Sequence, residues 1–138
     1  MHEGVEKARQ LAKYSSYFHN GKITNILRFG GHINVLLSSS KINPIIMPDN
    51  ISLSLDNTIE GRLHFEKLQA FNIDGKPCAD IFEMAYDLGK IVSLELEEGR
   101  CCLQVIWENN PPKPQVEILA NIEIKANYIC WIGSSERY

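Results

Sequence analysis

The chain has 138 residues, and its 17 acidic side chains outnumber its 14 basic ones, which gives a formal net charge of -3. A nucleic-acid-binding domain usually presents a basic face, so this balance argues against nucleic acid as a partner. Hydrophobic residues make up 44% of the chain and charged residues 22%, as is typical of a globular protein. The length predicts a single domain over residues 1–138.

The amino-terminal residues Met1–Glu6 are charged and lack the apolar centre of a signal peptide. No apolar run reaches the roughly 20 residues that span a bilayer. Four cysteines, at positions 78, 101, 102 and 130, form no C-x-x-C pair. We therefore expect four reduced thiols in a cytoplasmic protein that does not contact a membrane.

The first predicted element is a short helix over residues 3–14, which would cap a sheet. Small apolar residues recur at helical spacing there: Val5, Ala8, Leu11 and Ala12. From Lys22 the hydrophobic period changes to two, which predicts strands over 22–29 and 32–38. Gly30-Gly31 between them predicts a tight hairpin turn.

The middle of the chain is less regular. Prolines make residues 39–50 a connector, and an apolar alternation over 51–55 predicts a short strand. Another strand is expected over 62–72, with a bulge near Lys67 because its apolar residues change parity there. Asp74-Gly75 predicts a turn, and residues 78–87 fit either a helical turn or an irregular crossover.

The C-terminal half carries the strongest alternation. It predicts strands over 92–97 and 103–108, joined by a turn at Glu98-Gly99, with Val92, Leu94 and Leu96 on the inner face of the first strand. A proline-rich loop over 109–114 precedes an apolar face made by Val116, Ile118, Ala120, Ile122 and Ile124. Residues 128–132 either extend that strand or begin a last one.

These elements predict a mainly β (α+β) fold. About seven antiparallel strands would form a sandwich or a partly open barrel, with a β-rich core over 22–132 and one N-terminal helix. Such a scaffold leaves three kinds of function open: a protein that binds another protein, a barrel that holds a small ligand, and an enzyme whose site is assembled only by folding.

The chemistry-bearing residues match no catalytic or metal motif. His64-Phe65-Glu66 followed by Pro77-Cys78 begins like a zinc deaminase pattern, but Ile81 stands where its second cysteine belongs. The histidines at positions 2, 19, 32 and 64 lie far apart in sequence, and none pairs with another at ligand spacing. We therefore expect no metal, no cofactor and no catalytic residue. An enzyme would have to use Cys102, His64 or a carboxylate at a non-local site.

Acidic residues are concentrated between positions 74 and 98, where seven carboxylates face only two lysines. Complementary charge speeds protein association and selects the partner, so this segment predicts an acidic docking surface for a basic protein. Its candidate partner-binding residues are Asp74, Asp80, Glu83, Asp87, Glu95, Glu97 and Glu98.

The layout of several segments resembles a known group of proteins. The stretch from Tyr17 to Ile23 (YFHNGKI) leads into the Gly-Gly hairpin, and IEGRLHF over 59–65 and LELEEG over 94–99 follow. This layout, over roughly 17–132, resembles small β-rich immunity proteins of bacterial polymorphic toxin systems, including contact-dependent growth inhibition. Those proteins often open with an F-H-D-G-like step, in which Asn20 here replaces the acid.

The resemblance implies a function without catalysis. An immunity protein binds the toxin domain made by its own cell and blocks the toxin's active site or an essential surface. If that toxin is a nuclease, its cleft is basic, and an acidic inhibitor surface competes there with the nucleic acid. The resemblance carries over no catalytic or contact residues.

Overall fold

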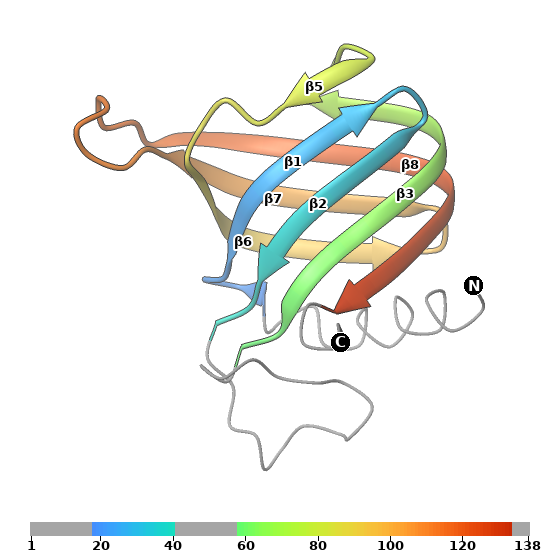
Figure 1. Cartoon of the computed structure of the whole chain (residues 1–138), viewed down its shortest axis with the longest axis horizontal. Coiled ribbons are helices and arrows are strands. Elements are labelled where there is room, and N and C mark those ends of the chain that lie inside the picture. The colour runs from blue at the N-terminus through green and yellow to red at the C-terminus, as the bar shows by residue number, and fades with distance from the viewer. Residues whose placement is uncertain (1–17, 41–57, 134–138) are drawn as a thin grey trace.

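The computed structural model describes residues 18–40 and 58–133, and these residues form an almost entirely β structure (Figure 1). The predicted helix over 3–14 and the predicted strand over 51–55 lie outside the described residues. Within the described ranges there is no helix that could cross a membrane. The strands are β1 (Lys22–Phe29), β2 (His32–Ser38), β3 (Glu60–Ile73), β4 (Lys76–Pro77), β5 (Ile81–Glu83), β6 (Leu88–Glu97), β7 (Arg100–Glu108) and β8 (Ile118–Gly133).

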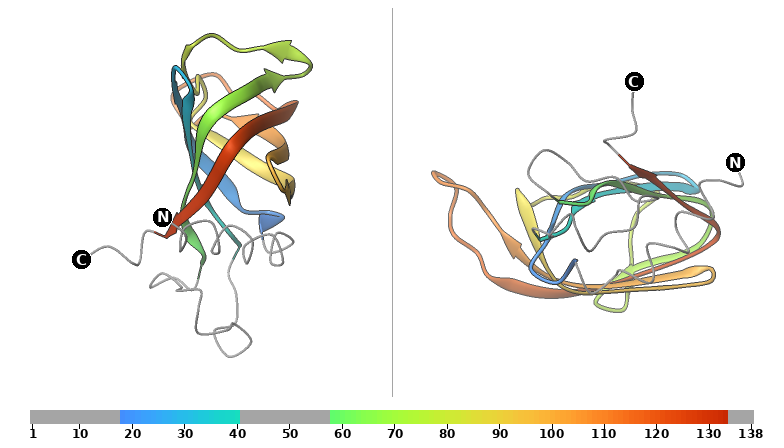
Figure 2. Two further views of the ribbon diagram at one scale, coloured as in Figure 1. Left: turned by 90° about the vertical axis from the view of Figure 1, so that its right-hand side faces the viewer. Right: turned by 90° about the horizontal axis from the view of Figure 1, so that it is seen from below.

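Six of these strands close into an antiparallel barrel in the order β2-β1-β6-β7-β8-β3. The ring is completed by pairing of β2 with β3, from Ile33 opposite Phe65 to Ser38 opposite Glu60. The expected sandwich or partly open barrel is therefore a closed barrel, which leaves no exposed edge along this seam. Figure 2 shows the strands running round one oval when the molecule is seen from below. The short strand β4 pairs antiparallel with the end of β3, and β5 pairs antiparallel with the end of β1.

The predicted bounds of the first two strands are confirmed, although their register shifts between Ile23 and Asn25. β1 and β2 have the predicted bounds, and Gly30 between them has φ 62°. The step before β1 is a tight turn in which Asn20 has φ 66°, a conformation that asparagine tolerates better than most residues. A Cβ on Gly21 would lie 2.3 Å from the Ser38 carbonyl oxygen, so glycine is required there.

The predicted bulge in β3 is also present. Lys67 has φ 54°, and the register between β3 and β8 shifts between Leu68 and Ala70. A second bulge, between Ile91 and Ser93, was not foreseen. It turns Val92 outward, where it is 38% exposed, and buries Ile91 instead. The prediction that Val92 shares an inner face with Leu94 is therefore wrong.

The other uncertain segments of the chain take definite forms. Residues 78–87 hold the three-residue strand β5, which pairs with the end of β1. Residues 118–133 form one continuous strand, so 128–132 extend β8. Along β8, Ala120, Ile122 and Ile124 are buried as predicted, whereas Ile118 at the strand's start is 44% exposed.

Large side chains from all six barrel strands fill the interior. Phe18 and Phe65 are fully buried, and both tryptophans, Trp107 and Trp131, are almost so. Phe18 packs edge-on against Trp131, with ring centroids 6.4 Å apart. Filling at this density is expected of a small barrel, and it leaves the outer wall as the surface available for recognition.

Candidate functional site

The seven carboxylates predicted to bind a partner fall into separate places on the barrel. Asp74 lies in the turn after β3, whereas Glu95, Glu97 and Glu98 lie at the far end of β6 and in the turn that follows. Asp87 immediately precedes β6, at the opposite end of that strand. Asp80 and Glu83 belong to the β5 segment, which lies against β1. The predicted set therefore does not form one continuous patch.

Two of the outlying carboxylates are occupied by internal contacts. Asp80 accepts a 3.3 Å contact from Arg28 Nη2. Asp87 lies 2.6 Å from Lys113 Nζ and accepts a hydrogen bond from the backbone N–H of Asn110. These two donors hold the pKa of Asp87 below its usual value. Both carboxylates fix loops of this molecule, and so they offer less charge to a partner.

Asp74, Glu95 and Glu97 lie on or beside an organised polar surface. Antiparallel pairing sets Asn72, Glu123, Cys102 and Glu95 side by side across β3, β8, β7 and β6. A second row, Asn121, Gln104 and Ser93, runs beside the first. Alternate strand residues face the same side, so both rows point away from the filled interior.

Asp74 closes the end of the second row. Its carboxylate accepts a 2.8 Å hydrogen bond from the backbone N–H of Asn121, and its own N–H donates to the Asn121 carbonyl oxygen. The turn that carries Asp74 is compact, with φ 54° at Asp74 and 79° at Gly75. The turn is thereby fixed against β8, which holds its carboxylate beside the two rows.

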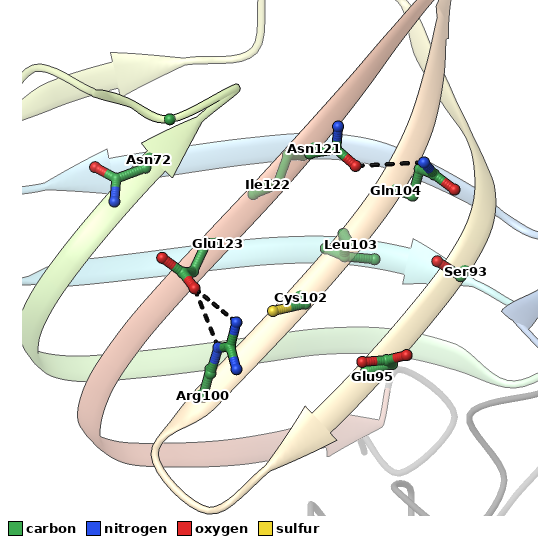
Figure 3. Close-up of a pocket in the computed structure, with 11 residues that line it drawn as sticks. Asn72, Ser93, Glu95, Arg100, Cys102, Leu103, Gln104, Asn121, Ile122 and Glu123 are labelled. Carbon is green, nitrogen blue, oxygen red and sulfur yellow. Dashed lines mark hydrogen bonds and ion pairs between the residues drawn. The ribbon is translucent and has the colours of Figure 1, made fainter.

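These rows surround a shallow hollow of about 370 Å³, shown in Figure 3. We name this surface the polar wall, and we include in it two bordering residues: Asp74, which bonds Asn121, and Glu97, whose strand partner is Arg100. Its lining residues are Asn72, Gly75, Ser93, Glu95, Arg100, Cys102, Leu103, Gln104, Asn121, Ile122 and Glu123.

Arg100 supplies the positive charge of the polar wall, and Glu123 balances it. Arg100 Nη2 and Nε donate to the same Glu123 oxygen at 2.8 and 3.1 Å. The hydrogen bond to Glu123 raises the pKa of Arg100, with a further contribution from the charge of Glu97. In the described part of the chain, no ion pair within 4 Å involves Asp74, Glu95 or Glu97. The wall therefore presents three acidic groups whose charge remains available.

Cys102 faces the polar wall as a neutral thiol. Partial burial is the main cause that raises its pKa, and the charges of Glu123, Glu95 and Glu97 raise it further against the opposing effect of Arg100. A thiol is nucleophilic only as the thiolate, so Cys102 is poorly suited to covalent chemistry at neutral pH. On β8, Cys102 pairs with Glu123 and His64 pairs with Cys130. These two positions are seven residues apart, so Cys102 and His64 are separated by roughly 23 Å along the strand direction. The fold does not assemble a Cys102–His64 couple.

A barrel that binds a small ligand needs a cavity lined by its inward-facing side chains. The inner faces instead supply a continuous cluster of buried side chains that includes Ile23, Leu63 and Ile124. At Gly61, a single added Cβ would meet the Trp131 ring at 2.7 Å. The described interior is packed rather than hollow.

Sequence reasoning missed two features of the molecule. One is the Arg100–Glu123 pair, because strand alternation places each residue on an outer face but does not tell which strands are neighbours. The other is a contact between His32 and His64, whose rings stack with centroids 5.9 Å apart across β2 and β3. The two histidines are 32 residues apart in sequence, so only the closure of the barrel brings them together.

Comparison with known proteins finds no matching family model, curated protein or solved structure.

Proposed function

We propose that this chain is a cytoplasmic immunity protein, which binds and neutralises a cognate toxin domain through the polar wall. The observation that supports the proposal is the arrangement of Asp74, Glu95 and Glu97 beside the balanced Arg100–Glu123 pair. Glu95 and Glu97 belong to β6, and Asp74 belongs to the turn after β3. Pairing with neighbouring strands holds both segments in fixed positions. A rigid binding surface loses little conformational freedom when it associates.

The chemistry of the wall fits a basic partner. Acidic groups on a rigid surface steer a positively charged protein and raise its association rate. A nuclease toxin has such a surface, because its substrate is a polyanion. An inhibitor that covers the basic cleft blocks the substrate without any catalysis of its own. The resemblance to immunity proteins, together with this wall, favours a toxin domain as the partner.

The predicted residues differ in how much charge they have available for a partner. Asp80 forms an ion pair with Arg28, and Asp87 forms one with Lys113. We therefore expect Asp80 and Asp87 to contribute little to partner binding. Glu95 and Glu97 project from the same outer face of β6, and no ion pair within the described residues involves them. We therefore expect Glu95 and Glu97 to carry most of the electrostatic contribution.

The test measures binding to a toxin domain encoded in the neighbouring reading frame. Glu95→Lys/Glu97→Lys should weaken binding by about ten-fold or more and abolish protection of cells that express the toxin. The matched control, Glu108→Lys/Glu117→Lys, changes the net charge equally at the end of β7 and just before β8, away from the wall. We expect the control to bind and protect nearly as well as the wild type.

Two results contradict the proposal. In one, the protein neither binds nor protects against the neighbouring toxin domain, or that neighbourhood encodes none. In the other, the control variant loses as much affinity as the wall variant, which places the interface elsewhere. Circular dichroism of both variants shows whether the fold is intact.

A further inference from the structure

A second cluster of polar side chains lies on the outer face of the seam that closes the barrel. His32 belongs to β2, whereas His64 and Glu66 belong to β3. One oxygen of Glu66 lies 3.3 Å from His64 Nε2 and 3.7 Å from His32 Nδ1. One nitrogen from each histidine and one carboxylate oxygen all lie within 4.8 Å of one another. Along β3, Glu66 is six residues, or roughly 20 Å, from Asn72 of the polar wall.

We propose that His32, His64 and Glu66 bind a divalent transition-metal ion, such as Zn²⁺, which cross-links the β2–β3 seam. Two imidazoles and one carboxylate are ligands that zinc uses when a fourth position stays open to water. Ligand atoms around a tetrahedral zinc lie roughly 3.3 Å apart, given metal–ligand bonds of about 2.0–2.1 Å. The two distances to the Glu66 oxygen are close to that spacing.

The hydrogen bond from His64 to Asn34 supports a metal at this place. His64 Nδ1 lies 2.8 Å from Asn34 Oδ1, which can only accept, so Nδ1 carries a hydrogen. In the neutral imidazole, Nε2 then has a lone pair directed at the Glu66 carboxylate. Two acceptors face each other unless a cation lies between them. A metal-binding histidine usually donates its other N–H to an oxygen, as His64 does here.

The exposure of the three side chains fits an ion that enters from water. The side chain of His32 is 59% exposed, that of Glu66 36% and that of His64 22%. The least exposed ligand is therefore also the one that Asn34 orients, while the most exposed ligand belongs to the opposite strand.

The competing explanation needs only a proton. A doubly protonated His64 would pair with Glu66 without any metal, and such exposed ion pairs contribute little to stability. The two explanations differ in one measurable way. The metal site requires His32 as well as His64, and the added ion should stabilise the folded chain because the ligands come together only in the closed barrel.

The experiment uses the full chain without an affinity tag, since a histidine tag would itself bind metal. Titration with Co²⁺, a spectroscopic substitute for Zn²⁺, should show one bound ion whose spectrum lacks thiolate-to-metal charge transfer. His32→Ala, His64→Ala and Glu66→Gln should each weaken binding by about ten-fold or more, and Asn34→Ala by about ten-fold. His19→Ala, which alters an exposed histidine outside the cluster, should bind as the wild type does.

Thermal unfolding provides the second readout. Excess Zn²⁺ should raise the melting temperature of the wild type and of His19→Ala, but not that of His32→Ala. His32 is more than half exposed, so its replacement should leave the fold intact even if His64→Ala fails to fold. The proposal is overturned if the wild type binds no more tightly than His32→Ala. It is also overturned if the cobalt spectrum shows thiolate ligands.

Discussion

Single residues fix the spacing between strands at the places where the barrel has least room. Gly61 lies on β3 directly opposite Gly133 of β8. A Cβ at Gly61 would lie 2.3 Å from the Ile132 carbonyl oxygen and 2.7 Å from the Trp131 ring. The backbone oxygen belongs to the sheet and cannot move aside without breaking the pairing of β3 with β8.

Gly61→Ala should therefore destabilise the protein by about 1–3 kcal/mol, the usual effect of overpacking a core. Urea denaturation measures the change in the free energy of unfolding. Gly31→Ala is the matched control, because the nearest atom to its added Cβ would be the Leu68 nitrogen at 3.9 Å. Gly31 lacks a positive φ, so that variant should be about 0.4–1 kcal/mol more stable. Equal losses in the two variants would contradict the packing explanation.

Asp87 links the stability of the folded chain to pH. The pKa of Asp87 is lowered in the folded state by Lys113 and by the Asn110 N–H. The ionised carboxylate therefore stabilises the fold above the usual pKa of 3.8, and this contribution is lost as the pH falls through the lower folded-state pKa.

Asp87→Asn should lower the melting temperature at neutral pH, and the difference from the wild type should shrink as the pH falls below 3.8. Thermal unfolding followed by circular dichroism over a pH series measures this convergence. If the difference in melting temperature between Asp87→Asn and the wild type stays constant from neutral to strongly acidic pH, the charge of Asp87 does not contribute to stability.

At the scale of elements, the bulge at Lys67 is the main device that keeps β3 in phase with its neighbours. Leu63 and Phe65 face the interior before it, and Leu68, which has the opposite parity, packs against the buried core after it. The cost is a lysine at φ 54°, where most side chains are strained. Because Lys67 is exposed, substitutions there change the backbone energy and little else.

Lys67→Val should therefore destabilise the protein by about 1–2 kcal/mol, since a β-branched residue is strongly disfavoured at positive φ. Lys67→Gly should be no less stable than the wild type, because glycine adopts this conformation without strain. Chemical denaturation of both variants measures the difference. Equal free energies of unfolding for Lys67→Val and Lys67→Gly would show that the backbone at this position is not strained.

How far the sequence predicts these elements depends on whether the signal is local. The β1–β2 hairpin and the Lys67 bulge follow from the Gly-Gly pair and from a change in hydrophobic parity, which are both local. The bulge at Val92 has no such signal, because an unbroken alternation of Val92, Leu94 and Leu96 conceals it. The cross-strand contacts of His32 and of Glu123 depend on strand order, which no local pattern specifies.

At the scale of the whole molecule, barrel closure separates the two candidate sites. The polar wall lies over β6, β7 and β8, and the histidine cluster lies on the β2–β3 seam. The interior that joins them is filled with apolar side chains, so both sites have to act on the outer surface. A closed barrel with a packed interior suits a protein that binds another macromolecule on its outside.

The proposed function requires that the acidic groups of the polar wall attract a basic toxin domain. The most direct measurement is the association rate of the two proteins as the salt concentration rises. For the wild type, the rate should fall steeply with salt, and for Glu95→Lys/Glu97→Lys it should start lower and change little. An association rate that responds neither to salt nor to this charge reversal would contradict the claim.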